Sequence, residues 1–306
     1  KNFSNIVATK LKILIYSLNF YPDKVGIGKY SGEMAQWLNK KGNDIKVICA
    51  PNYFPKWESF SNKYKVEKLR EIRVFRCPIW TFKNPNGLSR LILLISFALS
   101  SLPVLFSQKK WNPELVITIS PTLFCAFGSL LFTKLINPKT KNLIHIQDFE
   151  IDAAFNLKII KGNTFKKVAF FVERFLINNF DLITTISNGM YKKALTKGIS
   201  EEKLYLFPNW VNTNKIKNSN FNERKNNFYR KKLELSDEKI VIMYSGSMNK
   251  KQGLEIIPNI IKALRNYKNI VWIMGGEGPT KENLKKELRD IVNVYFFPLQ
   301  EEKYIE

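Results

Sequence analysis

Apolar and polar positions follow one another along the chain in blocks that predict a mixed α/β protein. Short apolar runs, of which residues 12–17 are the first, have the length of buried strands, and the longer stretches between them have the period of helices. Strands separated by helices are typical of βαβ units and a mostly parallel sheet. The predicted strands are 12–17, 44–50, 72–77, 114–119, 142–147, 181–186 and 203–207, and the predicted helices are 29–41, 88–107, 122–136, 164–179 and 188–197.

This alternation breaks at the stretch "FPNWVNTNK", which contains Pro208 and ends in polar residues. Such a stretch favours a crossing between two domains, so we divide the chain into 1–207 and 208–306. The second part has a further run of predicted strands and helices, beginning with "KIVIMYSGS". That run is too short to cover both faces of an independent α/β domain. We therefore expect 208–306 to be an incomplete second domain.

The longest apolar run extends from Leu91 to Phe106 and leaves two interpretations open. The run is too short to span a membrane comfortably. It carries a thin polar seam of serines, and a helix of this kind fits a membrane interface or the face of a sheet equally well. The basic residues that flank it are Arg90, Lys109 and Lys110.

Charge is the feature of composition that most affects the choice of function. The 306 residues include 49 Lys and Arg against 26 Asp and Glu, a net charge of +23, and most of the excess lies in the first two hundred residues. This favours an anionic partner, which can be a membrane surface, a nucleic acid or a phosphorylated substrate, unless the lysines are merely solvated. Three cysteines far apart suit a reducing compartment and exclude a disulfide framework or a zinc site.

A glycine pair, Gly26 and Gly28, follows the first predicted strand and precedes a predicted helix. The dinucleotide fingerprint G-x-G-x-x-G fits it badly, because the residues from Ser17 to Val25 intervene and Gly32 falls one position late. The next strand also lacks the acid that would hold a ribose. Free N–H groups at the start of a helix nevertheless favour an anion, so the alternatives are a phosphate site and a simple turn.

A second cluster of chemically active residues occurs in "HIQDFEIDAAF", at the end of an apolar run. It contains the chain's only histidine, His145, followed by Asp148, Glu150 and Asp152. Open α/β sheets bind ligands at the carboxyl ends of their strands, and a carboxylate held there can orient or deprotonate a hydroxyl group. The competing interpretation is a packed histidine, with acids that only cap a loop and a helix.

Taken in order along nearly the whole chain, several stretches resemble family 4 glycosyltransferases. More narrowly, they are similar to the bacterial colanic-acid and O-antigen branch, of the fucosyl- or N-acetylfucosaminyl-transferase type. The stretches are "NFYPDKVGIGKYSGEMAQWL", "APNYFPKW", "HIQDFEIDAAF", "LFPNWVNTN", "YSGSMNKKQGLE" and "GGEGP".

The resemblance implies a GT-B fold, in which two Rossmann-like domains face a cleft, the second one incomplete in this chain. It implies that His145 contacts the donor sugar, that Asp148 acts on the acceptor hydroxyl, and that no metal is needed. Ser247 and Gln252 stand where many relatives have Arg and Lys. The implied donor-binding residues are Gly26, Ile27, Gly28, Ser247, Lys251, Gln252, Gly276 and Glu277, with Glu150 and Asp152 on the acceptor side.

The implied activity is the retaining transfer of a sugar from a nucleotide-diphosphate-sugar to a polyprenyl-diphosphate-linked glycan, without a cofactor. Such an enzyme would work in the cytoplasm on the inner face of the membrane, where Arg90, Lys109 and Lys110 would meet anionic lipid. The resemblance also implies that a C-terminal part is absent, which leaves open whether this chain is active. The alternative is a basic nucleic-acid-binding protein without catalysis, although no sequence motif of that class is present.

Overall fold

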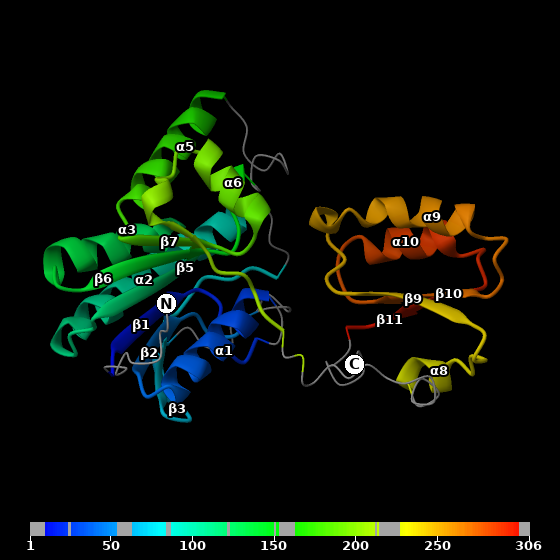
Figure 1. Cartoon of the computed structure of the whole chain (residues 1–306), viewed down its shortest axis with the longest axis horizontal. Helices are drawn as coiled ribbons and strands as arrows, with labels where there is room; N and C mark the ends of the chain where they lie inside the picture. The colour runs from blue at the N-terminus through cyan, green and yellow to red at the C-terminus, as the bar shows by residue number, and fades with distance from the viewer. Residues whose placement is uncertain are drawn as a thin grey trace, which may run out of the picture. The chain divides into compact units, whose positions relative to one another are not determined.

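In the computed structural model of the chain, the residues form two compact units, Lys1–Trp210 (unit 1) and Val211–Glu306 (unit 2) (Figure 1). The division falls just beyond the boundary predicted at residues 207 and 208. Both units are α/β, as the sequence pattern predicts. The residues that the structure describes are 10–23, 26–53, 63–83, 87–120, 123–149, 151–152, 163–211, 213 and 227–299.

Unit 1 contains an eight-stranded sheet in the order β3-β4-β2-β1-β5-β6-β7-β8. Neighbouring strands are parallel except β3 and β4, which are antiparallel. The carboxyl ends of the parallel strands therefore meet along one side, called here the carboxyl edge of unit 1. The strands are β1 (Lys12–Ser17), β2 (Asp44–Cys49), β3 (Lys65–Leu69), β4 (Ile72–Arg76), β5 (Leu115–Ser120), β6 (Lys141–Ile146), β7 (Leu182–Thr185) and β8 (Leu204–Leu206).

Helices pack on both faces of this sheet, because the strands near its centre are apolar on both sides. α1 (Gly26–Lys40) buries Met34 and Ala35 against one face of β1, while α2 (Gly87–Ser107) and α3 (Leu123–Leu131) pack on the other. The remaining elements are the π-helix Phe132–Ile136, the helices α5 (Asn163–Asn178) and α6 (Asn188–Thr196), and the short 3-10 turns Gln108–Lys110 and Glu201–Lys203.

The segment Gly87–Lys110, which is α2 with the turn after it, is apolar enough and long enough to cross a membrane. It is the only such helix among the described residues. One face of it nevertheless belongs to the core of unit 1. Phe97 and Leu105 have no exposed surface, and Ser101 lies in a hydrogen bond of 2.5 Å with the hydroxyl of Tyr16 on β1. Of the two interpretations of this helix, packing against the sheet therefore holds for that face.

The serine seam of α2 binds a neighbouring stretch of chain. Ser96 Oγ accepts a hydrogen bond from the backbone N of Trp80 at 3.0 Å, and Ser100 Oγ donates to the carbonyl O of Pro78 at 2.7 Å. The side of the helix that faces away from the core leaves Leu88 and Leu99 about two-thirds exposed. The seam thus holds the segment that leads into α2.

Unit 2 has a three-stranded parallel sheet in the order β11-β10-β9. Two helices, α9 and α10, lie together on one side of it, and α8 lies on the other (Figure 1). The elements are β9 (Ile240–Ser245), β10 (Ile270–Gly275), β11 (Val294–Phe297), α8 (Phe228–Lys232), α9 (Ile257–Ala263), α10 (Lys281–Leu288), and the 3-10 turns Lys250–Gln252 and Leu254–Ile256.

Two elements were not predicted, and a third differs in kind. β3 is an edge strand with the sequence KVEKL, in which no residue is buried, so it lacks an apolar signal. Charged residues on an edge strand discourage pairing with other chains. α8 is one short turn capped by Asn227, which accepts hydrogen bonds from the backbone N atoms of Tyr229 and Arg230. The predicted helix 122–136 is α-helical only to Leu131 and continues as a π-helix.

Candidate functional site

His145 lies near the carboxyl end of β6, on the face of the sheet that α1 covers. The strand register pairs it with Ile119 of β5 and with Thr184 of β7. Only 2% of its surface is exposed, and the ring of Phe207 packs edge-on at 5.3 Å between centroids. The predicted site histidine is therefore a core residue at the edge where ligands of open α/β sheets bind.

Both ring nitrogens of His145 have hydrogen-bond partners. Nδ1 lies 2.8 Å from Oγ1 of Thr184, and Nε2 lies 2.9 Å from Nε2 of Gln147. Burial lowers the pKa of His145 from 6.5 to about 4, because the charged imidazolium loses its hydration. The ring is accordingly neutral at pH 7, and Gln147 stands between it and the carboxyl edge.

Gln147 is paired in turn with Asn209, from the segment predicted to cross between domains. Nε2 of Gln147 donates to Oδ1 of Asn209 at 3.0 Å, and Nδ2 of Asn209 donates to Oε1 of Gln147 at 3.0 Å. The adjacent Trp210 donates from Nε1 to Oε2 of Glu33 on α1 at 2.7 Å, and its ring meets that of Tyr30 edge-on. Residues 207–210 therefore form part of unit 1 and touch both β6 and α1.

The acids that follow His145 have different surroundings. Asp148 is half-buried, and its carbonyl O accepts a hydrogen bond from Oγ of Ser120 at the end of β5. Asp152 forms ion pairs with Lys193 at 2.8 Å and Lys197 at 2.6 Å, both on or beside α6. Although burial alone would raise the pKa of Asp152, these two ammonium groups lower it.

Asp152 thus fastens its segment to α6 through ion pairs. Lys197 also pairs with Glu173 of α5 and lies over the ring of Phe170 at 4.0 Å. The third acid, Glu150, lies outside the described residues. Of the three predicted acids, Asp148 is the one that the structure brings to the carboxyl edge beside His145.

Gly26, Ile27 and Gly28 form the first turn of α1, but the two glycines meet different surroundings. Gly26 has a φ of +59°, and a Cβ built on it would have no atom of the described residues within 4 Å. A Cβ on Gly28 would lie 2.3 Å from Cβ of Asp23. Gly28 is therefore explained by the close approach of Asp23, whereas Gly26 leaves open space at a helix start.

Two charged residues near this turn, Asp23 and Arg76, were not singled out from the sequence. The carboxyl group of Asp23 accepts a hydrogen bond from Asn19 at 3.3 Å, and burial raises its pKa. Arg76, at the end of β4, is 6% exposed and donates to Glu67 Oε1 at 2.9 Å, to the carbonyl O of Ala50 at 3.1 Å and to that of Tyr21. The only sequence signal for Arg76 was a basic residue near the end of the predicted strand 72–77.

In unit 2, the loops after β9 and β10 lie against each other. The backbone N of Gly246 donates to the carbonyl O of Gly275 at 2.9 Å, and that of Met248 donates to Glu277 at 2.9 Å. Gly276 has a φ of +154°, and a Cβ there would lie 1.8 Å from the carbonyl O of Gly246. A Cβ on Gly278 would likewise lie 2.3 Å from the carbonyl O of Met248, so Gly276 and Gly278 of "GGEGP" are required by loop packing, with or without a ligand.

The predicted donor-binding residues of unit 2 all belong to these two neighbouring loops. Ser247 is half-buried, and its carbonyl O accepts a hydrogen bond from the hydroxyl of Tyr244 at 2.7 Å. Gln252 is exposed in the turn after it, and the side chain of Lys251 lies outside the described part. Glu277 is half-exposed and pairs with Lys281 at 2.7 Å. These residues share the carboxyl end of the unit 2 sheet.

The three basic residues predicted to face a membrane are exposed at the two ends of α2. Arg90 lies in its first turn, and Lys109 and Lys110 lie in the turn that follows it. Across the described ranges, no group of three or more His, Cys, Asp and Glu residues is placed to hold a metal ion.

Known structures with the same arrangement of elements identify the fold as GT-B, the two-domain fold of many glycosyltransferases. A sucrose-phosphate synthase from Thermosynechococcus elongatus matches with a TM-score of 0.70 at 13% identity, over 97% of this chain and 72% of the other. Anabaena HepE, solved with UDP-glucose, matches with a TM-score of 0.61 at 15% identity, over 95% and 70%.

The chain belongs to the glycosyl transferase 4-like domain family, whose sequence model matches residues 25–210. It is 38% identical over 301 residues to WcaI of Escherichia coli (strain K12), a glycosyl transferase assigned by its name to colanic acid biosynthesis. That match covers 95% of this chain and 72% of WcaI. An uncharacterised protein of the Klebsiella pneumoniae cps region is 29% identical over 202 residues, or 64% of this chain and 49% of the other. The predicted fold and family are confirmed.

Proposed function

We propose that the protein transfers a sugar from a nucleotide-diphosphate-sugar to a lipid-linked glycan during synthesis of a bacterial surface polysaccharide, with retention of anomeric configuration and without a metal or other cofactor. The observation that carries this proposal is the 38% identity to WcaI, which extends over 95% of the chain. HepE, with the same fold, was solved with UDP-glucose, which supports a nucleotide-sugar as donor.

The arrangement of unit 1 supports an anionic ligand at its carboxyl edge. Gly26 begins a helix of fifteen residues, whose first N–H groups are not used within the helix and favour negative charge. Its open surroundings leave room for a diphosphate to approach the backbone. Asp148 is the carboxylate proposed to orient or deprotonate the acceptor hydroxyl, and His145 is proposed to act on the donor sugar.

The experiment is a panel of UDP-, GDP- and dTDP-sugars offered to the protein, followed by a lipid-linked acceptor. Saturable binding of one donor and transfer of its sugar support the proposal, and product stereochemistry decides retention. Binding of RNA with a steep salt dependence, together with no donor binding, would favour the rival class of a basic nucleic-acid-binding protein.

Substitutions in the glycine turn test the ligand contact directly. Asn tolerates a positive φ, so Gly26→Asn keeps the backbone and fills the open space with a side chain. We expect weakened donor binding with stability nearly unchanged. Gly28→Ala is the contrasting variant, because its Cβ would collide with Asp23 and lower stability. Undiminished donor binding by Gly26→Asn would mean that this position is only a turn.

We further propose that the enzyme acts as a peripheral protein on the inner face of the cytoplasmic membrane. Leu88, Ile95 and Leu99 form an exposed stripe on α2, at the spacing of one helix face, and the exposed Arg90, Lys109 and Lys110 lie near the two ends of the helix. Anionic lipid attracts such residues by about 1 kcal/mol each, and apolar insertion adds to this.

Flotation with anionic vesicles tests this surface. Changing Arg90, Lys109 and Lys110 to Gln should reduce binding, and high salt should reduce it further. The matched control changes the same number of exposed cations in unit 2, to give Lys262→Gln, Arg265→Gln and Lys268→Gln. Equal losses in both variants would show that net charge alone acts, and no preference for anionic lipid at low salt would refute the proposal.

A further inference from the structure

A continuous chain of hydrogen bonds runs from the crossing segment to the only histidine. Asn209 and Gln147 exchange two hydrogen bonds of 3.0 Å each, and Nε2 of Gln147 also lies 2.9 Å from Nε2 of His145. An amide nitrogen is only a donor, so Nε2 of His145 must accept. The proton of the neutral ring is then on Nδ1 and points to Thr184 Oγ1, at 2.8 Å.

The hydrogen bonds of Thr184, at the far end of this series, are consistent with this assignment. The hydroxyl of Thr184 accepts from Nδ1–H and donates to the carbonyl O of Ile144 at 3.4 Å. Both hydrogens of the Gln147 amide are used, one on His145 and one on Asn209. Each amide and ring atom in this series of hydrogen bonds therefore has a single role, and the Thr184 hydroxyl is the one group that both accepts and donates.

For the neutral ring, only one other arrangement satisfies the contacts among the two amides and the ring. Both amides turn over, Oε1 of Gln147 accepts from Nε2–H of His145, and the hydroxyl of Thr184 donates to Nδ1 instead of to a carbonyl. Neither amide can turn alone, since two donors or two acceptors would then face each other. The orientation of Asn209 and the tautomer of His145 are therefore linked.

The neighbours of Asn209 hold the crossing segment in place on both sides. Phe207 packs on the ring of His145, and its backbone N donates to the carbonyl O of Thr185 at 2.8 Å. Trp210 binds Glu33 of α1, the helix that begins at Gly26. The segment therefore joins the strand that carries His145 to the helix that carries the glycine turn.

We propose that Asn209 is a positioning residue for the carboxyl edge of unit 1: through Gln147 it fixes His145 as the neutral Nδ1–H tautomer and holds the crossing segment at that edge. Its effect on sugar transfer rests on the proposed function, whereas its effect on His145 does not. A ligand that takes the place of Gln147 at Nε2 of His145 must also break the hydrogen bonds between Gln147 and Asn209. Asn209 lies at the end of unit 1, just before the polypeptide continues to unit 2.

NMR of the ring nitrogens tests the assignment, because one histidine gives one pair of ¹⁵N resonances. In the wild-type protein we expect a protonated Nδ1 and an unprotonated Nε2, unchanged from about pH 8 to about pH 5. Gln147→Glu places a carboxylate at Nε2, so the proton should move to Nε2 or the ring should become charged at a higher pH. Asn209→Ala should move both resonances toward the average of the two tautomers.

Two further variants separate positioning from a general loss of structure. Asn209→Asp keeps an acceptor for Nε2 of Gln147 but places a second acceptor against its Oε1, so it should retain the protonated Nδ1 and only part of the wild-type spectrum. Asn179→Ala removes an exposed amide that donates to the carbonyl O of Phe175 on α5, and it should change nothing at His145. A protonated Nε2 in the wild type, or an Asn209→Ala spectrum identical to the wild type, would overturn the proposal.

Transfer assays on the same variants separate this proposal from the proposed function. Asn209→Ala should lower donor turnover about tenfold or more, as small displacements of site groups do, and Asn209→Asp should recover part of it. Shifted resonances with undiminished turnover would refute positioning of the reaction. If the wild type shows the expected ¹⁵N resonances but transfers no sugar from any donor in the panel, the proposed function is contradicted and the assignment at His145 is not.

Discussion

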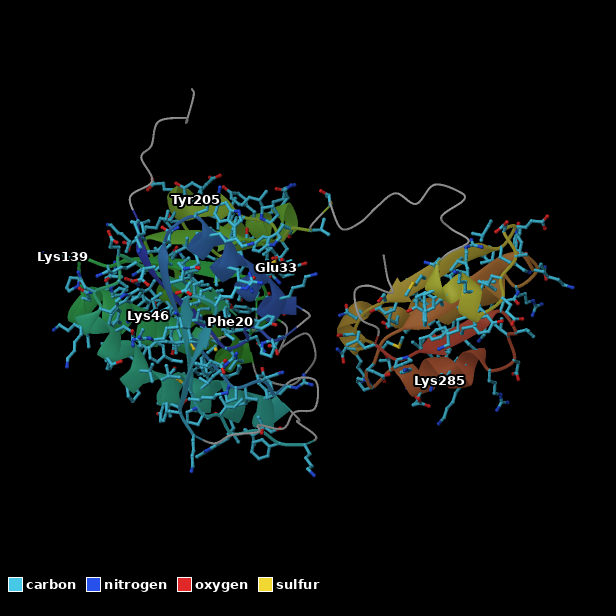
Figure 2. All side chains as sticks on the ribbon, turned by 90° about the horizontal axis from the view of Figure 1, so that it is seen from below. Phe20, Glu33, Lys46, Lys139, Tyr205 and Lys285 are labelled. Carbon is cyan, nitrogen blue, oxygen red and sulfur yellow. The ribbon has the colours of Figure 1, made fainter. Side chains whose placement is uncertain are left out.

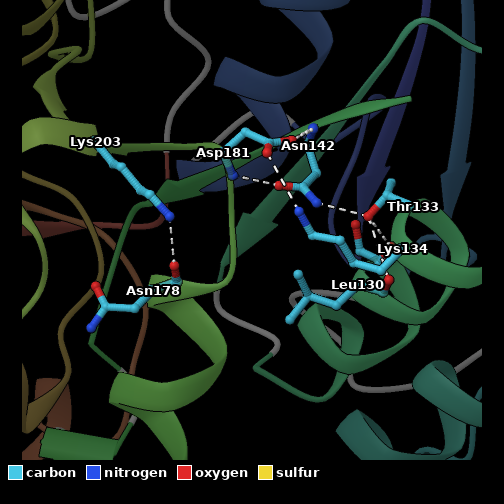
Figure 3. A network of polar contacts seen from close by, with 8 residues as sticks. Leu130, Thr133, Lys134, Asn142, Asn178, Asp181 and Lys203 are labelled. Carbon is cyan, nitrogen blue, oxygen red and sulfur yellow. Dashed lines mark hydrogen bonds and ion pairs between the residues drawn. The ribbon is translucent and has the colours of Figure 1, made fainter. Parts of the chain in front are cut away.

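The two ends of β6 both place polar side chains inside the sheet, but their hydrogen-bond networks end differently. At the amino end, Asn142 has no exposed surface; its Oδ1 accepts from the backbone N of Asp181 at 2.6 Å, and its Nδ2 donates to Thr133 at 2.7 Å (Figure 3). At the carboxyl end, the network of His145 continues through the half-buried Gln147 to a segment 62 residues further along the chain.

The contrast separates a network whose members are closed within the fold from one that ends at partly exposed groups. The amino-end network closes on the neighbouring strand and on the helix that covers it, so all its members stabilise the same packing. The two networks are also far apart in unit 1. Lys139, just before the amino end of β6, lies on the opposite side of the unit from Glu33, which accepts a hydrogen bond from Trp210 of the crossing segment (Figure 2). The carboxyl-end network includes half-exposed amides, which can exchange partners.

The largest expected effect is at the amino end of β6, called here the closed end because its network closes within the fold. Asn142→Ala should destabilise the protein by about 4 kcal/mol, because it removes two buried side-chain hydrogen bonds, leaves the Thr133 hydroxyl without a donor and leaves a cavity in place of the amide. The backbone N of Asp181 keeps the carbonyl O of residue 142 at 3.2 Å, and the hydroxyl of Thr133 keeps that of Ser129 at 2.9 Å. Chemical denaturation measures the loss, with the exposed Asn179→Ala as control. Ligand binding by the folded fraction should be unchanged, and a small loss of stability would show that this network is not closed.

The second effect depends on pH and concerns the carboxyl end of β6, called here the open end because its network reaches partly exposed amides. His145 is neutral in the folded protein down to about pH 4, whereas in the unfolded chain it is protonated below its ordinary value of 6.5. The unfolded state therefore binds the extra proton between these values, and stability falls as pH falls through that window, by about 3 kcal/mol in all. His145→Gln removes this part of the pH dependence, so the comparison of the two denaturation profiles isolates it.

A smaller effect on stability, with a larger one on activity, is expected at Gln147. Gln147→Ala removes hydrogen bonds among partly exposed groups and should cost about 1 kcal/mol of stability. Turnover should fall about tenfold or more, because the ring of His145 loses its partner at the carboxyl edge. Denaturation and transfer are to be measured on one preparation. Loss of stability as large as that of Asn142→Ala would remove the distinction between the two ends.

The smallest effect is expected where the closed network reaches the surface. Lys134 Nζ lies 3.4 Å from Oδ1 of Asp181, and both side chains are partly exposed. Lys134→Ala should cost a few tenths of a kcal/mol, less at high salt. Lys139→Ala, at an exposed position nearby, is the control for the loss of charge. A loss above about 1 kcal/mol would mean that the ion pair is part of the closed network.

The sequence predicts most of this fold because apolar runs mark strands wherever they become buried. β1 and β9 have similar sequences, KILIYS and IVIMYS, and both were predicted. Their burial differs because β1 lies between two strands, whereas β9 pairs only with β10 among the described residues. β3 was missed because an exposed edge strand has no apolar pattern. The pattern along a chain therefore predicts a strand, but not its neighbours.

The candidate site was predictable only in part, because its contacts join distant parts of the chain. The position of His145 at a strand end follows from the sequence, but its partners Thr184 and Gln147 depend on strand register and side-chain orientation. Gly28 was expected to admit a ligand, yet the atom closest to it belongs to Asp23. A glycine shows that something approaches closely, and only the fold shows what it is.

The packing of α2 also has a consequence for the synthesis of the protein on the ribosome. The segment Gly87–Lys110, whose most apolar 18-residue window has a mean hydropathy of 2.0, resembles the helices that translocation machinery inserts into membranes. Its core face packs with Leu14, Tyr16 and Ile48, which lie in β1 and β2 and therefore leave the ribosome before it. Because amino-terminal elements can begin to fold during synthesis, the helix meets an existing protein surface. The order of the elements thus favours folding over membrane insertion for this segment.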